Sequence, residues 1–412
     1  MQLIEKIIDK FEKYLQLDLR SYVKNTSYLM AVNVISIICG LATSIAFTRL
    51  TSKEVYGQFG FIMSVVGVFA IFSLPGMDTS IVQAAANGYD KIFSEGTKTR
   101  FKWSFIGSGS LIVTGVYYYF IEGSSLLAVC FFIATLFFPA FFVLESYSSF
   151  LRGKKQFNID SEYRSISLVA SALVTIAVIY YFRDLKWIVF GSMASASLMN
   201  LYFFTRISKK QKMNNEMDEG AISYGKHLTL AGVIFRVRAH YDKIIIAGFL
   251  GFAEVAIYSI ARVFAEQIYN LVKNVGHATF PDFAILEKKD AYLAIKKRLF
   301  YVFLGIGLIS VVGIILVPYF IPLLFTLKYT ESILYAQLFF IIVIPRSLAI
   351  LFYMVLQAQK ETQTLYKINF GYAISEIILL SVLVPSFGLM GLVVSKGISN
   401  SIYLVLCLWG VK

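Results

Sequence analysis

Ionisable side chains recur inside an otherwise apolar stretch of the chain that runs from Tyr224 to His277. They are Arg236, Arg238, His240, Asp242, Lys243, Arg262, Glu266, Lys273 and His277. A charged group at the centre of a membrane-spanning helix costs about 2.5–3.5 kcal/mol even on the scale derived from insertion experiments. A chain that repeats this cost within two neighbouring segments is expected to line a water-filled cavity with them.

Helical spacing places these side chains on defined faces. Arg236, His240 and Lys243 follow one another at i, i+4 and i+7 and therefore share a face. Arg238 and Asp242, at i and i+4 on a neighbouring face, can form an ion pair. The second segment predicts a polar stripe in steps of four and three residues: Glu254, Tyr258, Arg262, Glu266, Asn270, Lys273 and His277.

Positive charge exceeds negative charge in this pair of segments. The carboxylates Asp242 and Glu266 face a larger set of cations, namely Arg236, Arg238, Lys243, Arg262 and Lys273. Ion pairs that only hold the helices together are the simpler interpretation, but such pairing cannot neutralise every cation. The surplus favours an anionic substrate.

The composition is that of a polytopic membrane protein, because 58% of the 412 residues are apolar and only 15% are charged. The net charge of +13 does not indicate nucleic-acid binding, since the basic residues form short clusters between apolar spans. Cys39, Cys130 and Cys407 fall within apolar spans and do not have the spacing of a metal site. The sequence therefore predicts neither a metal nor a cofactor.

Spans of about 20 apolar residues are needed to cross the hydrocarbon core of a bilayer. The sequence predicts an all-α protein with twelve of them, near residues 28–48, 57–75, 103–121, 125–145, 164–182, 186–205, 228–249, 254–276, 299–325, 332–356, 366–384 and 387–409. Residues 1–24 precede the first span. Apolar side chains within them have helical spacing, which predicts a cytoplasmic amphipathic helix that either lies on the membrane surface or packs on the protein's own loops.

The basic residues indicate the orientation of the chain. Seven of the 38 lysines and arginines fall inside spans, and five fall in the predicted outer turns: Arg49, Lys53, Arg183, Lys186 and Lys328. The remaining 26 fall in the N-terminal segment, the alternate loops and the C-terminus. The positive-inside rule then places both termini in the cytoplasm.

The chain contains a weak internal repeat. The segment Leu50–Val55 and the segment Leu250–Val255 each form the predicted turn after the first span of a six-span half. The longest polar segment lies between the halves. The predicted organisation is an N-terminal bundle of six helices (25–205), a cytoplasmic linker (206–222) and a C-terminal bundle of six helices (223–412).

Two segments resemble a known family. Residues Thr48–Phe59 and Ala247–Ala261 are similar to the outer turns of the Wzx-type oligosaccharide flippases, polysaccharide transporters of the MATE-like MOP superfamily. The resemblance implies two bundles around a V-shaped central cavity, alternating access and no enzymatic activity. It implies an undecaprenyl-pyrophosphate-linked repeat unit of O-antigen, capsule or exopolysaccharide as cargo, moved to the outer leaflet of the bacterial cytoplasmic (inner) membrane.

Cations are the groups that would bind the pyrophosphate, and Arg236, Arg238, Lys243, Arg262 and Lys273 are the candidates. Asn33 lies on a polar stripe of the first span and could meet the sugars, with close helix packing as the alternative role of that stripe. Arg346 follows Pro345, so a kink could expose it to the cavity.

Carboxylates could couple transport to an ion. Asp242 is predicted to pair with Arg262 or Arg238 in the empty protein and to act as a latch, although a permanent pair with Arg238 would be purely structural. Glu266, further along the polar stripe, is the first candidate for an ion-coupling group that takes up H+ or Na+. Glu376 is a second candidate and could instead pair with Lys396.

Other functions fit less well. A cation-coupled multidrug antiporter of the same superfamily needs a cavity that tolerates cations, and lipid II flippases usually carry two further helices after the twelfth. A membrane-embedded glycan polymerase would need a paired acidic motif or a large outer loop. Membrane lipids and glycan polymerase machinery are the expected partners, and nucleic acid is not.

Overall fold

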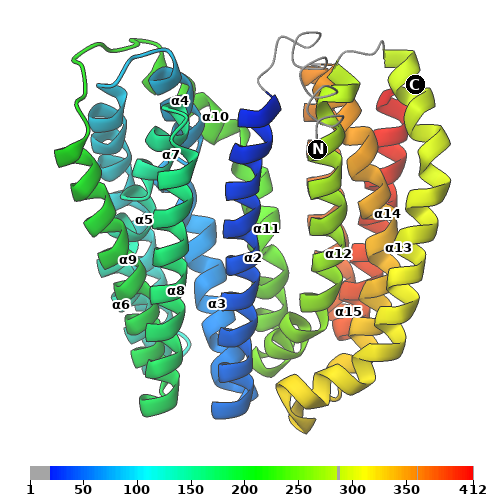
Figure 1. The fold of residues 1–412 in the computed structure, drawn as a ribbon. Coiled ribbons are helices and arrows are strands. Elements are labelled where there is room, and N and C mark those ends of the chain that lie inside the picture. The colour runs from blue at the N-terminus through cyan, green and yellow to red at the C-terminus, as the bar shows by residue number, and fades with distance from the viewer. Residues whose placement is uncertain (1–18, 285–287, 360, 412) are drawn as a thin grey trace. The chain divides into compact units, whose positions relative to one another are not determined.

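The computed structural model describes residues 19–411 except 285–287 and 360 (Figure 1). The predicted amphipathic helix of residues 1–24 therefore lies mostly outside the described residues. The elements are α2 (Leu19–Leu50), α3 (Lys53–Phe69), η1 (Ala70–Ser73), α4 (Gly76–Ala86), α5 (Ile92–Phe120), α6 (Ser125–Val143), α7 (Ser146–Gly153), α8 (Phe157–Phe182), α9 (Leu185–Lys210), α10 (Ala221–Ala231), α11 (Val233–Phe249), α12 (Phe252–Ala284), α13 (Lys288–Phe325), η2 (Leu327–Tyr329), α14 (Ser332–Ala358) and α15 (Thr362–Val411).

Each predicted span lies largely within helices. Within the ranges 19–284, 288–359 and 361–411, eight helices are long and apolar enough to cross a membrane, and they are α2, α3, α6 with α7, α8, α9, α13, α14 and α15. Of these, α15 holds two predicted spans that meet at Gly388, whose φ of 60° interrupts the helix. The other three predicted spans lie in α5, in α10 and α11 on either side of Gly232, and in α12, and these helices carry charged side chains. The chain is thus an all-α, multi-pass membrane protein.

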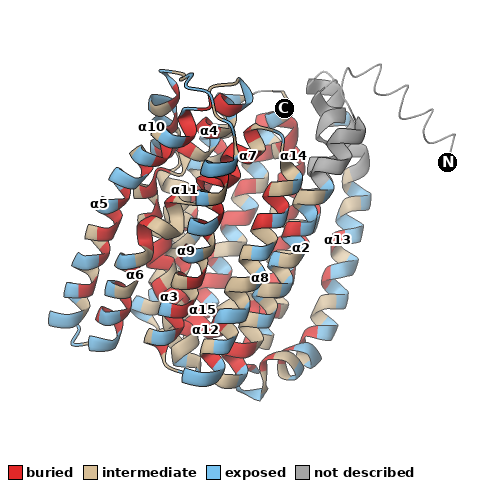
Figure 2. Cartoon of the chain, turned by 60° about the vertical axis from the view of Figure 1, so that its left-hand side comes forward, coloured by how far each residue is buried: buried red, intermediate tan, exposed pale blue. Residues whose placement is uncertain are grey.

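The exposed surface of the helices is apolar, as a lipid environment requires. Leu308, Val311 and Ile315 on α13 are each more than half exposed. By contrast, α14 carries a long run of buried residues, including Phe352 and Val355 (Figure 2). The helix α14 is therefore a core element of its part of the chain, whereas α13 is peripheral.

The chain divides into two compact units, and each consists of two segments. The first unit contains α2 as far as Ala46 together with Phe69–Ala231, and the second contains Phe47–Val68 together with the described residues from Gly232 onward. This differs from the predicted boundary at 206–222, because α10 belongs to the first unit and most of α3 to the second. A polar linker marks where the chain is exposed, and packing decides which helices group together.

Hydrogen bonds attach α10 to the first unit. The amide of Gly76 at the start of α4 donates to the Thr229 hydroxyl (3.0 Å), and the Ser80 hydroxyl donates to the carbonyl of Ala221 (2.5 Å). A side chain at Gly76 or Gly225 would overlap the facing helix. The two helices are therefore as close as their backbones permit, and α10 cannot serve as a free linker.

A buried arginine ties together the short helices of the first unit. Arg100 on α5 is 2% exposed and donates to Asp78 on α4, to the Ser146 hydroxyl and to the carbonyls of Ser73 and Phe142. All of these contacts lie within one unit, and each one satisfies a polar group that would be costly to bury alone. The cluster accordingly has a structural role.

A row of glycines explains why α3 belongs to the second unit. Gly57 faces the backbone of Phe252, Gly60 lies beside Lys243 and Val255, and Gly67 lies against the His240 ring. Glycines at this spacing share one helix face and let neighbouring helices approach closely. The face of α11 that carries His240 and Lys243 is therefore packed against α3.

Gly57→Ala should destabilise the protein by about 1–3 kcal/mol, since overpacking a close contact carries this cost. The new Cβ would overlap the carbonyl of Phe252, and a backbone group cannot rotate away. The measurement is the thermal unfolding midpoint in detergent. Gly248→Ala is the matched control, because Gly248 is a helical glycine of the same unit with open space around it. Equal midpoints for the two variants would contradict this packing.

Candidate functional site

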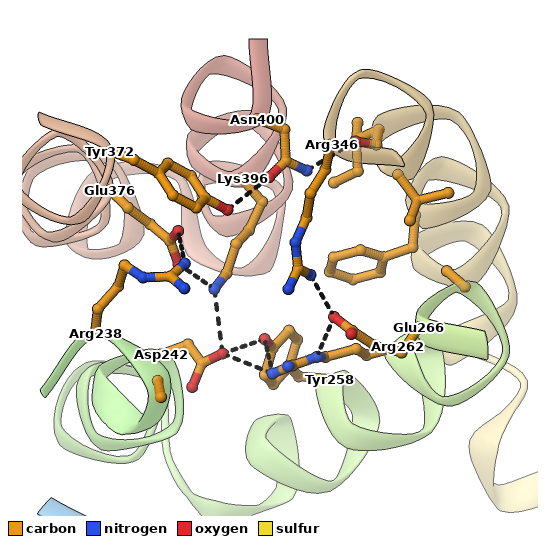
Figure 3. A pocket seen from close by; sticks show the side chains of 15 residues that line it. Arg238, Asp242, Tyr258, Arg262, Glu266, Arg346, Tyr372, Glu376, Lys396 and Asn400 are labelled. Atoms are coloured by element: carbon orange, nitrogen blue, oxygen red, sulfur yellow. Dashed lines mark hydrogen bonds and ion pairs between the residues drawn. The ribbon is translucent and has the colours of Figure 1, made fainter. Parts of the chain in front are cut away.

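Among the described residues of the second unit, seven ionisable side chains from α11, α12, α14 and both halves of α15 lie in one connected row (Figure 3). Taken in order of contact they alternate in sign, and we call them the ion chain: Arg238, Glu376, Lys396, Asp242, Arg262, Glu266 and Arg346. Alternation gives every carboxylate a cation on each side. These four cations and three carboxylates leave a surplus of one positive charge.

The first half of the ion chain connects α11 with α15. The guanidinium of Arg238 lies 2.8 Å from Oε2 of Glu376. The ammonium of Lys396 bridges two carboxylates, at 2.5 Å from Oε1 of Glu376 and 3.3 Å from Oδ2 of Asp242. Asp242 and Glu376 are almost completely buried, at 1% and 0% exposure. Carboxylates buried this deeply stay charged only when they are paired and hydrogen-bonded.

The second half connects α11, α12 and α14. Arg262 bridges Asp242 and Glu266, with its Nη1 3.0 Å from Asp242 Oδ2 and its Nε 2.9 Å from Glu266 Oε1. Arg346 closes the row at 2.9 Å from the same Glu266 oxygen. Glu266 is more open to solvent than the other two carboxylates, since its side chain is 25% exposed. Both of its partners are arginines.

Neutral side chains hold the ion chain in position. The buried Tyr258 hydroxyl donates to Asp242 and accepts a hydrogen bond from Arg262 (3.1 Å). The Tyr372 hydroxyl donates to the amide oxygen of Asn400 (3.0 Å), whose amide nitrogen donates to the carbonyl of Ile342 (2.8 Å). Sequence reasoning did not select Tyr372 and Asn400. Their spacing of four residues from Glu376 and Lys396 was the available signal.

The two arginines at the ends of the row retain unused hydrogen-bonding capacity. Within the described part of the chain, Arg238 and Arg346 each form one ion pair, and Arg238 Nε is buried without a hydrogen-bond partner. Each guanidinium lies over a tyrosine ring, Arg238 at 4.4 Å from the centre of Tyr372 and Arg346 at 3.8 Å from that of Tyr269. Such stacking orients a guanidinium and leaves its edge donors available.

The ion chain lines a cavity of about 130 Å³. A water molecule needs roughly 10–15 Å³ of such volume, so the cavity has room for a small polyatomic ion. At about 1.5 Å per residue, the charged groups on α11, α12 and α15 lie about 12 to 22 Å from the Gly251 and Gly388 turns. This is the middle of a spanning helix in a hydrocarbon core of about 30 Å.

The structure brings together part of the predicted set. Arg238, Arg262 and Arg346 share one cavity, with the predicted carboxylates Asp242, Glu266 and Glu376 between them. The predicted pairs Asp242–Arg262 and Lys396–Glu376 are confirmed. The alternative pair of Asp242 with Arg238 is wrong, because Arg262 and Lys396 contact Asp242 and Arg238 contacts Glu376.

Other predicted residues do not line this cavity. Lys243 lies beside Gly60 of α3, and Arg236 is half-buried elsewhere on α11. Lys273 is exposed on α12, and Asn33 is exposed on α2 in the first unit. The helical face shared by Arg236, His240 and Lys243 is therefore a packing face where it meets α3. The His277 side chain lies outside the described residues.

A net-cationic cavity at mid-depth among membrane-spanning helices is typical of a membrane transporter. Comparison with known proteins identifies the family to which the chain belongs. The model of the family described as "Polysaccharide biosynthesis protein" matches residues 22–287, which is more than half of the chain. The chain belongs to this family.

Similar proteins extend the match to nearly the whole chain. A Shigella flexneri protein named "Putative O-antigen transporter" is 21% identical to this chain. The match covers 94% of this chain and 97% of that protein. Among solved structures, the lipid II flippase MurJ in an inward closed conformation has a TM-score of 0.71 at 17% identity, covering 93% of this chain and 87% of its own. An inward-facing MATE multidrug transporter has a TM-score of 0.67 at 12% identity, and the match covers 91% of this chain and 93% of that transporter. At these identities the two structures show only that the chain shares their fold.

Proposed function

We propose that this chain is a flippase for an undecaprenyl-pyrophosphate-linked oligosaccharide. In this proposal it moves the repeat unit of a surface polysaccharide from the inner to the outer leaflet of the bacterial cytoplasmic membrane by alternating access. Both chain termini lie in the cytoplasm. Membership of the polysaccharide biosynthesis family and the full-length similarity to the Shigella flexneri protein support a transporter of this class.

The observation that carries the proposal is the ion chain with its arginine ends. A pyrophosphate offers several oxygens to the planar guanidinium of arginine, which binds phosphate through two parallel hydrogen bonds. Arg238, Arg262 and Arg346 line the same cavity and together supply such donors. The surplus positive charge attracts the anion into a site of low dielectric constant.

The interleaved carboxylates make anion binding reversible. A transporter must bind its cargo firmly enough to admit it and weakly enough to release it. When a pyrophosphate binds an arginine, Asp242 and Glu376 each keep Lys396 as a partner, because only one of their two partners is an arginine. When the cargo leaves, the carboxylate reclaims that arginine, so the empty site is never a set of unpaired buried cations.

Glu266 is the carboxylate that an entering pyrophosphate would release. Both of its partners, Arg262 and Arg346, are arginines that the phosphate would engage, and its side chain is partly open to solvent. We assign Glu266 the uptake of H+ or Na+ when the cargo binds. Asp242 acts as a latch instead, because Lys396 and Tyr258 continue to hold it when Arg262 turns to the cargo.

A cation-coupled drug antiporter fits this site less well. Such a transporter offers carboxylates to a cationic drug, whereas each carboxylate of the ion chain already lies between two cations. The surplus positive charge would repel the drug. A lipid II flippase handles the same pyrophosphate with different sugars, and the choice between those cargoes is made by transport measurements.

Translocation in reconstituted vesicles tests the proposal. The protein, with Cys39, Cys130 and Cys407 replaced and one cysteine introduced at Ser52, is reconstituted, and labelling of that cysteine from outside identifies the population with outward Ser52. That population should move undecaprenyl-pyrophosphate-linked glycan toward the Ser52 side, faster than lipid II or a cationic dye. Glu266→Gln should abolish any dependence on an H+ or Na+ gradient. Movement of the dye alone would contradict the proposal.

A further inference from the structure

Four tyrosines form a second layer beside the ion chain, on the side away from the Gly251 and Gly388 turns. Each lies three, four or seven residues along its helix from a member of the ion chain, which places it on the same helix face. The pairs are Tyr269 with Glu266 on α12, Tyr353 with Arg346 on α14, and Tyr372 with Glu376 and Tyr403 with Lys396 on the two halves of α15.

The tyrosines contact one another and an amide. Tyr372 and Tyr403 stack with ring centres 4.5 Å apart, and Tyr353 lies 6.2 Å from Tyr403. The amide nitrogen of Asn369, one turn before Tyr372, donates to the Tyr353 hydroxyl at 2.9 Å. These contacts join three tyrosines and Asn369 into one group, which meets the ion chain where the Arg238 guanidinium stacks on the Tyr372 ring.

The layer has a closed part and an open part. Tyr372 and Tyr403 are buried, whereas Tyr269, Tyr353 and Asn369 are only partly buried. Tyr353 accepts the hydrogen bond from Asn369, so its own hydroxyl proton remains available to donate. The side-chain amide oxygen of Asn369 makes no hydrogen bond to another residue in the described ranges, since this amide forms its hydrogen bond through its nitrogen. The open part therefore presents aromatic surface with a hydroxyl donor and an amide acceptor.

These groups suit a sugar ring. A pyranose has an apolar C–H face that packs on an aromatic ring and hydroxyl groups that both donate and accept hydrogen bonds. The position of the layer fits as well. In a glycosyl pyrophosphate the first sugar is bonded directly to a phosphate oxygen, so a sugar lies next to the bound anion. The proposed phosphate ligands stack on tyrosine rings of this layer, Arg346 on Tyr269 and Arg238 on Tyr372.

We propose that Tyr269, Tyr353 and Asn369 form a subsite for the first sugar of the lipid-linked glycan. This inference rests on the proposed function, because it assumes a pyrophosphate at the ion chain. Tyr372 and Tyr403 support the subsite from behind without touching the sugar. The subsite would make the protein bind a glycan-bearing lipid more tightly than the bare lipid pyrophosphate that carries no sugar.

The test compares two lipids on the purified full-length protein. One is undecaprenyl pyrophosphate, and the other is the same lipid carrying N-acetylglucosamine or galactose, whichever binds more tightly. The wild-type protein should bind the sugar-bearing lipid about 10-fold or more tightly than the bare lipid. Tyr353→Phe and Asn369→Leu should each reduce this ratio about 2- to 10-fold, the range expected for a lost hydrogen bond, and leave the affinity for the bare lipid unchanged.

Tyr319→Phe on the exposed surface of α13 is the control and should leave the ratio unchanged. A purely structural role for the tyrosine layer would lower both affinities equally and overturn the subsite. A wild-type ratio near one would also overturn it, with the proposed function intact. Failure of the wild-type protein to bind either lipid would instead overturn the proposed function.

Discussion

Asp242→Asn should lower the free energy of unfolding by about 3–5 kcal/mol, the cost of removing one partner from a buried ion pair. Asp242 is 1% exposed and is held by Lys396, Arg262 and the Tyr258 hydroxyl. A neutral amide would raise the surplus charge of the ion chain from one to two and leave two cations facing each other. The loss is measured as a lower midpoint of thermal unfolding in detergent.

A second substitution makes this prediction specific to charge. Lys396→Met in the Asp242→Asn background removes one of the two cations that had contacted Asp242 and returns the surplus to one. Glu376 keeps Arg238, and Glu266 keeps both of its arginines. The double variant should therefore regain most of the lost stability. A double variant less stable than Asp242→Asn alone would show that the ion chain is not an electrostatic unit.

Periodicity within one helix predicted the parts of the site that lie on α12. The steps of three and four residues placed Tyr258, Arg262 and Glu266 on a single face, and the structure has them there. The short turn near Gly251 also placed Asp242 and Arg262 at similar depth, which is why their pairing could be predicted. Glu376 and Lys396 are likewise antiparallel neighbours across Gly388 and form a pair.

Contacts between distant helices could not be predicted in this way. Arg238 meets Glu376 across 138 positions of sequence, and Lys396 meets Asp242 across 154. A helical pattern reports which residues share a face but not which helix that face meets. For the same reason Lys243 was assigned to the cavity, although its face of α11 packs against Gly60 of α3. The glycine row on α3 was the sequence signal for that packing.

Arg238→Gln and Arg346→Gln should each weaken binding of undecaprenyl pyrophosphate about 10- to 100-fold, because a hydrogen bond to a charged group contributes about 1.5–3 kcal/mol. Each substitution removes an end of the ion chain and brings its surplus charge to zero. Folding should be preserved, since Glu376 still contacts Lys396 and Glu266 still contacts Arg262. Affinity is measured on purified protein, and glycan export in cells that lack the native transporter.

Conservative and distant replacements separate recognition from simple loss of charge. Arg346→Lys keeps the charge but not the planar, two-point geometry, so its affinity should fall between those of the wild type and Arg346→Gln. Arg183→Gln, at an exposed arginine in the other unit, removes one positive charge far along the chain and should leave binding unchanged. If Arg183→Gln weakened binding as much as Arg346→Gln, net charge alone would attract the lipid, and the ends of the ion chain would lose their assigned role. If Arg346→Lys matched the wild type, a point charge would suffice there, and two-point phosphate binding at Arg346 would be excluded.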